Sequence, residues 1–146
     1  IALGNKIKKS DKYTYLILGD GECNEGQVWE GAMFAAHQKL DNLIIFVDYN
    51  KLQIDGPVAD VIGPAPFEPK LEAFGYNVIT IDGHDFNEIE AAFKAARECK
   101  GRPTAIVANT VKGKGVSFME NNVGWHGKAP NTEEYEIAMR ELGERA

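Results

Sequence analysis

The sequence predicts an α/β fold, a mostly parallel sheet with helices on both faces, in one domain spanning residues 1–146. Runs of β-branched and aromatic residues without polar alternation recur along the chain, which is typical of strands buried on both faces. Segments of helical length separate these runs, and such alternation favours a parallel sheet. A chain of 146 residues, 44% of them hydrophobic and 26% charged, can bury one ordinary globular core.

The sequence is predicted to begin in the middle of a helix. Residues 1–9 are predicted to be the last turns of a helix, because Lys8 and Lys9 place positive charge where the helix dipole favours it. No initiator Met precedes Ile1. We therefore expect a fragment of a longer subunit, with a fold that is incomplete at its N-terminus.

The first half of the chain predicts one strand–helix–strand unit. Residues 13–18 and 43–47 are the apolar strands, and residues 25–40 form the helix between them. Asn24 is the expected N-cap of this helix, and Gln27 completes a pair resembling a capping box. A unit of this length brings the carboxyl ends of both strands to the same edge of the sheet.

The second half continues the alternation. We expect helices at residues 67–74, 86–99 and 132–144, strands at 76–81 and 103–109, and a Gly-rich loop at 111–131. Gly75 should close the first of these helices as its C′ residue, and Thr132 should cap the last. Loops as long as the one before Thr132 are often functional.

Asp20 and Asn50 are predicted to meet where the first two strands end. Asp20 lies between Gly19 and Gly21 directly after the first strand, and Asn50 follows the second. Open α/β sheets bind ligands at this edge. One carboxylate and one amide oxygen suit a hard cation such as Mg²⁺, with water and phosphate oxygens completing its coordination.

The two glycines beside Asp20 indicate an anion next to this cation. Gly19 and Gly21 carry no Cβ atom, so backbone N–H groups can approach a ligand closely. The predicted helix that follows presents its N-terminus to the same anion. The local chemistry therefore predicts a metal-bridged diphosphate.

Several segments together resemble the transketolase family. They are residues 19–32, 37–43 and 48–56, followed by Ile81-Asp-Gly-His-Asp85 and Gly124-Trp-His-Gly127. The resemblance extends through essentially the whole chain and is closest to the N-terminal subunit of split, two-chain transketolases. It implies the diphosphate-binding half of a thiamine-diphosphate-binding fold.

The resemblance also implies roles for individual residues. Asp20 and Asn50 would bind Mg²⁺ through their side chains and Leu52 through its backbone carbonyl, with Ca²⁺ or Mn²⁺ as substitutes. The cofactor would further contact the surrounding turn at Gly19, Gly21 and Glu22. His126 resembles a histidine near the diphosphate and the donor sugar's C1 hydroxyl, which makes it the predicted catalytic residue.

Other polar positions have roles that the resemblance suggests or leaves open. Glu25 and Glu30 resemble acidic residues at the subunit interface that link paired active sites through waters. His84 lies in a turn whose composition turn chemistry also explains. Lys112 and Lys114 are equally compatible with phosphate contact and with simple solvation.

By resemblance, the reaction is transfer of a two-carbon ketol unit from a ketose, often a sugar phosphate, to an aldose, as in the pentose phosphate pathway. In this family the glutamate that activates the cofactor's aminopyrimidine belongs to a second domain, for which this chain has no candidate. We therefore expect a pyrimidine-binding partner subunit, a dimer of such units, and no ketol transfer by this chain alone.

Two alternatives remain. A relative of deoxyxylulose-phosphate synthase would also bind thiamine diphosphate, although it usually carries Met-Ser-Ile where this chain has Leu52-Gln-Ile54. A non-catalytic module could bind Mg²⁺ and diphosphate without turnover. Dinucleotide and P-loop motifs are absent from the sequence.

Composition and sequence patterns argue against nucleic-acid binding, a membrane span and a disulfide framework. A net charge of −6 disfavours nucleic acid as a partner, because binding it requires a basic face. The sequence has no apolar run long enough for a membrane span and no signal-peptide pattern. Cys23 and Cys99 are too few for a disulfide framework, which fits the cytoplasm, and Cys23 is expected to be a packing residue.

Overall fold

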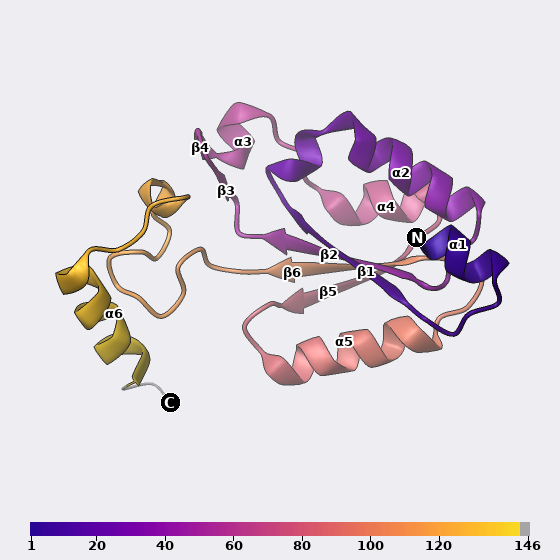
Figure 1. The fold of residues 1–146 in the computed structure, drawn as a ribbon. Helices are drawn as coiled ribbons and strands as arrows, with labels where there is room; N and C mark the ends of the chain where they lie inside the picture. The colour runs from indigo at the N-terminus through magenta and orange to yellow at the C-terminus, as the bar shows by residue number, and fades with distance from the viewer. Residues whose placement is uncertain (144–146) are drawn as a thin grey trace.

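The computed structural model describes residues 1–143, which contain a four-stranded parallel sheet in the order β1-β2-β6-β5 (Figure 1). Its strands are β1 Thr14–Gly19, β2 Leu43–Tyr49, β5 Asn77–Asp82 and β6 Thr104–Asn109. A short antiparallel hairpin of β3 Leu52–Gln53 and β4 Gly56–Pro57 follows β2. The predicted α/β fold class is confirmed, although this hairpin was not expected from the sequence.

Helices cover both faces of the sheet. The α-helices are α1 Ala2–Ile7, α2 Gly26–His37, α3 Val58–Val61, α4 Phe67–Phe74, α5 Phe86–Glu98 and α6 Thr132–Gly143. Helices α2 and α4 lie on one face and α5 on the other, while α6 lies beyond the carboxyl ends of the strands (Figure 1). Within residues 1–143, no helix is long and apolar enough to cross a membrane.

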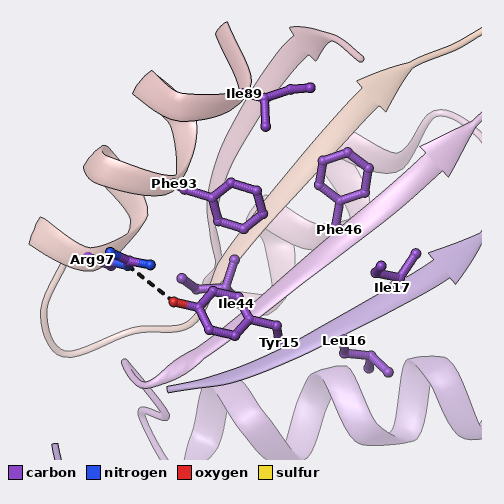
Figure 2. Close-up of a pocket in the computed structure, with 8 residues that line it drawn as sticks. All are labelled: Tyr15, Leu16, Ile17, Ile44, Phe46, Ile89, Phe93 and Arg97. Carbon is purple, nitrogen blue, oxygen red and sulfur yellow. Dashed lines mark hydrogen bonds between the residues drawn. The ribbon is translucent and has the colours of Figure 1, made fainter. Parts of the chain in front are cut away.

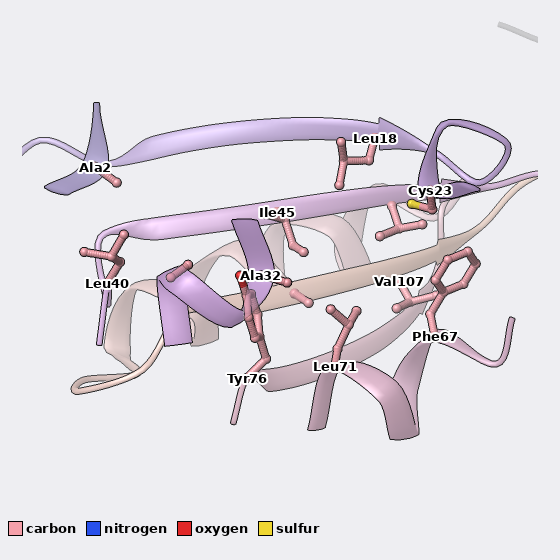
Figure 3. Close-up of a cluster of buried hydrophobic side chains, with 13 residues drawn as sticks. Ala2, Leu18, Cys23, Ala32, Leu40, Ile45, Phe67, Leu71, Tyr76 and Val107 are labelled. Atoms are coloured by element: carbon pink, nitrogen blue, oxygen red, sulfur yellow. The ribbon is translucent and has the colours of Figure 1, made fainter. Parts of the chain in front are cut away.

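Alternating side chains of the central strands build a separate core on each face. Successive strand residues point to opposite faces, so β2 directs Ile45 and Val47 toward α2 and α4, and Ile44 toward α5. The first core also takes in Leu71 and Phe67 of α4 (Figure 3). This two-sided burial explains why the central strands are apolar throughout.

Phe67 is the largest fully buried side chain in the structure, which predicts a large stability effect. It is 1% exposed, and its ring packs edge-on against Tyr49 with centroids 5.2 Å apart. We expect Phe67→Ala to lower the free energy of unfolding by about 3–5 kcal/mol through lost burial and a residual cavity. Urea denaturation measures the loss. The control is Phe86→Ala, because the Phe86 side chain is 84% exposed. Equal urea midpoints for the two variants would show that Phe67 is not packed in the core as described.

One expectation about the sheet was wrong, because β1 is not buried on both sides. Tyr15, Leu16 and Ile17 are 48%, 44% and 72% exposed. In the described part of the chain β1 pairs only with β2, so it forms an edge of the sheet. Its exposed side chains line an apolar groove together with Phe46 of β2 and Phe93 of α5 (Figure 2).

The predicted caps of two helices also require correction. Asn24 is the last residue of a 3-10 helix, η1 Glu22–Asn24, and α2 begins at Gly26 after Glu25, without a side-chain cap. At α6, Asn131 rather than Thr132 is the cap. Its Oδ1 accepts from the Glu134 N–H at 2.9 Å, and the Glu134 carboxylate accepts from the Asn131 N–H at 2.8 Å.

Other boundaries agree with the sequence to within a few residues. Helix α4 spans the predicted residues 67–74, and Gly75 closes it in the left-handed region at φ 99°. The long loop contains a second 3-10 helix, η2 Val123–Trp125. The predicted last residue of the final helix, Glu144, lies outside the described residues.

Candidate functional site

The predicted site residues converge on one cavity at the carboxyl edge of the sheet. The β1–β2 register pairs Gly19 with Asp48, so the two strands end at the same level. The cavity has a volume of about 740 Å³. Every residue predicted to bind the cofactor or the metal lines it: Gly19, Asp20, Gly21, Glu22, Asn50, Leu52 and His126.

Asp20 is a buried carboxylate at the base of this cavity. It is only 1% exposed, and its two oxygens accept the N–H groups of Gly21, at 2.8 Å, and Lys51. Burial raises the pKa of Asp20, and the nearby Asp48 carboxylate adds to the shift, while the two N–H groups and Lys112 oppose it. A divalent cation beside Asp20 would offset this cost of a buried negative charge.

Asn50 presents its amide between two fixed partners. Its Oδ1 accepts the Leu52 N–H at 3.0 Å, and its Nδ2 donates to Asp48 Oδ2 at 3.3 Å. The second lone pair of Oδ1 remains available for a ligand. Together, the Asp20 carboxylate and the Asn50 amide oxygen form a donor set suited to a hard cation.

The N–H groups of the two glycines beside Asp20 donate to nearby carboxylates. The Gly21 N–H donates to Asp20, and the Gly19 N–H donates to the Glu22 carboxylate at 3.2 Å. Gly21 is also required for close packing, since a Cβ there would lie 2.7 Å from Gln53 Cβ.

Gln53 is a site residue that the sequence alone did not reveal. It lines the cavity, and its buried Nε2 has no hydrogen-bond partner among residues 1–143. Its Oε1 accepts from Asn24 Nδ2 at 3.4 Å, which holds the side chain against the turn at Gly21.

The structure distinguishes the basic residues that the sequence left open. Lys112 and His126 line the cavity, whereas Lys114 is exposed. His84 lies in an adjoining pocket with Thr110 and Lys112, and its Nε2 accepts the Val111 N–H at 2.8 Å.

The two predicted interface glutamates, Glu25 and Glu30, differ in their relation to the cavity. Glu25 is the N-cap residue of α2 and lines the cavity, while Glu30 is exposed on the helix itself. Both are exposed side chains in this chain. Their assignment to a subunit interface stays a prediction.

Cys23 packs beside the cavity and should be chemically inert. It is 2% exposed and belongs to the core under α2. Burial, with smaller contributions from the carboxylates of Glu22 and Asp20, raises the pKa of its thiol to about 12. We expect iodoacetamide at about pH 8 to alkylate Cys99 and leave Cys23 protected, because the thiolate is the nucleophile. Mass spectrometry measures the labelling, and urea-unfolded protein, which should react at both sites, is the control.

A scan against family models matches residues 4–145 to the thiamine diphosphate binding domain of transketolase. The chain belongs to the transketolase family. The match covers nearly the whole chain, so the cavity at Asp20 and Asn50 lies within a thiamine-diphosphate-binding domain.

Curated relatives support this assignment. A 6-deoxy-6-sulfo-D-fructose transketolase subunit from Clostridium sp. (strain MSTE9) is 47% identical over 142 residues, covering 97% of this chain and 52% of the relative. An apulose-4-phosphate transketolase subunit from Phocaeicola vulgatus is 38% identical over 145 residues, covering 99% of this chain and 52% of the relative. The chain thus spans about half the length of these relatives.

Solved transketolase structures share the fold. The transketolase of Campylobacter jejuni superposes with a TM-score of 0.86 at 32% identity, over 92% of this chain and 21% of that one. The transketolase of Leishmania mexicana superposes with a TM-score of 0.70 at 25% identity, over 92% of this chain and 23% of that one.

Proposed function

We propose that this chain supplies the diphosphate- and metal-binding half of a transketolase active site. The observation that carries the proposal is the convergence of Asp20 and Asn50, from two parallel strand ends, on one polar cavity of a transketolase-family domain. Mg²⁺ would be held by the Asp20 carboxylate, the Asn50 amide oxygen and the Leu52 carbonyl. Ca²⁺ or Mn²⁺ offers the same preference for oxygen ligands.

The surrounding residues would bind and orient the diphosphate. Lys112 contributes a cation to the lining of the cavity, Gln53 lines it as well, and the turn at Gly19–Glu22 forms part of its wall. Thiamine diphosphate, when bound, supplies the carbanion chemistry of ketol transfer, and the protein contributes anchoring and electrostatics. The metal serves mainly to fix the diphosphate.

His126 is the proposed catalytic residue of this chain. Its imidazole lines the same cavity as the metal ligands, on the long loop after β6. From there it would hydrogen-bond to substrate and move a proton at a sugar hydroxyl. Glu25, which also lines the cavity, and Glu30 are proposed to face a second active site across a dimer interface.

The complete reaction requires a partner. We propose that a pyrimidine-binding transketolase subunit or domain supplies the glutamate that this chain lacks, and that the chain alone does not transfer ketol units. Relatives are named as transketolase subunits, which supports a divided enzyme. Their names also cite a sulfosugar and apulose 4-phosphate, so we propose an anionic ketose as donor without assigning the pentose phosphate pathway.

Calorimetry of thiamine diphosphate binding tests the proposal. We would titrate the cofactor, with and without Mg²⁺, into the intact natural protein assembled with its partner subunit. Mg²⁺-dependent binding together with ketol transfer to an aldose supports the proposal. Binding without turnover favours the non-catalytic module, and pyruvate-dependent release of CO₂ favours a deoxyxylulose-phosphate synthase relative. Absence of binding by the complex rejects the thiamine site.

A further inference from the structure

We propose that Thr110 is a positioning residue for Asn50, acting through Asp48, and that the turn at residues 82–84 holds Thr110 in place. The inference rests on the proposed function, because it concerns the orientation of Asn50 toward the cation. It adds residues to the site that neither bind the metal nor touch the cofactor.

Asp48 and the Leu52 N–H together fix which end of the Asn50 amide faces the cavity. Asn50 Nδ2 donates to Asp48 Oδ2 at 3.3 Å, and the Thr110 hydroxyl donates to the other carboxylate oxygen, Oδ1. A carboxylate can only accept hydrogen bonds, so the NH₂ group of Asn50 must point toward Asp48. The amide oxygen is then left on the side of the Leu52 N–H and the cavity, which is the orientation that a cation requires.

Thr110 is itself fixed from two strands. Its N–H donates to the Tyr49 carbonyl at 3.2 Å, which ties the residue after β6 to the end of β2. On its other side, Gly83 packs so closely that a Cβ there would lie 2.4 Å from Thr110 Cγ2. Only glycine at position 83 leaves room for Thr110 to reach Asp48.

His84 holds the backbone of Val111, the residue that follows Thr110. Its Nε2 accepts the Val111 N–H at 2.8 Å, so the neutral ring carries its proton on Nδ1. The His84 N–H donates to the Asp82 carboxylate at 2.9 Å, and the Gly83 N–H donates to the Asn109 carbonyl at 2.8 Å. The ends of β5, β6 and β2 are thus joined in series, and Asn50 lies at the end of that series.

Thr110 lies outside the cavity proposed to hold the cation, so it would position a metal ligand without binding the metal itself. Thr110 and His84 lie in the adjoining pocket, whereas Asp20, Asn50 and Leu52 line the site cavity. Asp48, Asn50 and Lys112 line both. The hydrogen bonds from the Thr110 hydroxyl and from Asn50 Nδ2 both end on the Asp48 carboxylate, so this carboxylate carries the effect of Thr110 to Asn50, as outer residues commonly orient metal ligands.

The test compares Thr110→Val, which removes the hydroxyl at nearly constant volume, with Thr110→Ser, which keeps it. In the intact protein assembled with its partner, thiamine diphosphate binding is titrated against Mg²⁺ concentration. We expect Thr110→Val to raise the Mg²⁺ concentration at half-saturation about 10-fold, and Thr110→Ser to stay close to wild type. An unchanged Mg²⁺ midpoint in Thr110→Val, or an equal loss in Thr110→Ser, would overturn the inference.

A second readout needs no cation. In the metal-free protein, the Asn50 side-chain NH₂ protons should exchange with solvent faster in Thr110→Val than in wild type or Thr110→Ser, as measured by NMR. Equal exchange in all three proteins would show that Thr110 does not control the amide. Failure of the wild-type complex to bind cofactor would instead reject the proposed function, and this inference with it.

His84→Ala tests the connection to the turn. If His84 acts through Thr110, His84→Ala should weaken the response to Mg²⁺, and the double variant should be no weaker than Thr110→Val alone, since both changes break the same series. Full additivity of the two losses would show that His84 acts on the site independently.

Discussion

Replacing Asp20 with Ala should abolish Mg²⁺-dependent binding of thiamine diphosphate. Asp20 is the proposed carboxylate ligand of the cation, and it is a buried side chain held in place by two backbone N–H groups. We expect the affinity to fall by more than about 100-fold, beyond the 10- to 100-fold typical of residues that only orient ligands. Calorimetry on the complex with the partner subunit measures this loss.

Asp60→Ala is the matched control for Asp20→Ala. Asp60 lies on the short helix α3 and is exposed, so the variant makes the same change of charge away from the cavity. It should bind cofactor like wild type. Retention of Mg²⁺-dependent binding in Asp20→Ala would remove Asp20 from the metal site.

The raised pKa of Asp20 adds a pH dependence to the stability of the metal-free protein. Burial favours the protonated carboxyl in the folded state, so the folded protein holds more protons than the unfolded chain between the ordinary and the raised pKa. The stabilisation from this proton is complete below the ordinary pKa and is lost as the pH rises through the folded value. Relative to Asp20→Asn, the free energy of unfolding of the wild type should therefore rise as the pH falls. At neutral pH, where the buried Asp20 carboxylate is ionised and destabilises the fold, added Mg²⁺ should restore the lost stability.

The sequence was sufficient for those parts of the site that depend on strand ends. Asp20 and Asn50 follow apolar runs joined by a helix, and parallel pairing forces such ends together. Gly75 was likewise predictable as a helix end, because glycine readily adopts the left-handed conformation found there. These are consequences of local pattern and chain connectivity.

Other features depend on neighbours that no local pattern specifies. The sequence of β1 is that of a buried strand, yet Ile17 is 72% exposed, because sheet order decides which strand lies at an edge. Asn131 and Thr132 are both good caps, and only the reciprocal bonds with Glu134 distinguish them. The contact of Gly83 with Thr110 joins two strand ends that are distant in sequence, and the turn composition around Gly83 gave no sign of it.

Gly113→Ala should be among the most damaging single changes in the chain outside the core. Gly113 has φ of 71°, and a Cβ there would lie 2.6 Å from both the carbonyl carbon and the oxygen of Met119. Because the obstacle is backbone, no side-chain rotation relieves it. Strain and overpacking together should lower the free energy of unfolding by about 2–5 kcal/mol.

The same change should also weaken cofactor binding. Gly113 follows Lys112, whose carbonyl accepts the Asn121 N–H at 2.9 Å to close the loop. Expanding the loop to admit a methyl group breaks that closure and moves Lys112 away from the cavity that it lines. Urea denaturation measures the first effect, and titration of the partnered protein with thiamine diphosphate measures the second.

Gly101→Ala is the control that separates the two causes of the loss in Gly113→Ala, which are collision with Met119 and the strain of a positive φ. Gly101 has a similar φ of 78°, but a Cβ there would meet no atom within 4 Å. It should lose only about 1–2 kcal/mol, the cost of holding an L-residue in the left-handed region, and it should bind cofactor normally. If Gly113→Ala were no less stable than Gly101→Ala and bound cofactor equally well, the contact with Met119 would not constrain the loop. A larger loss confined to Gly113→Ala would show that this contact fixes the loop that presents Lys112.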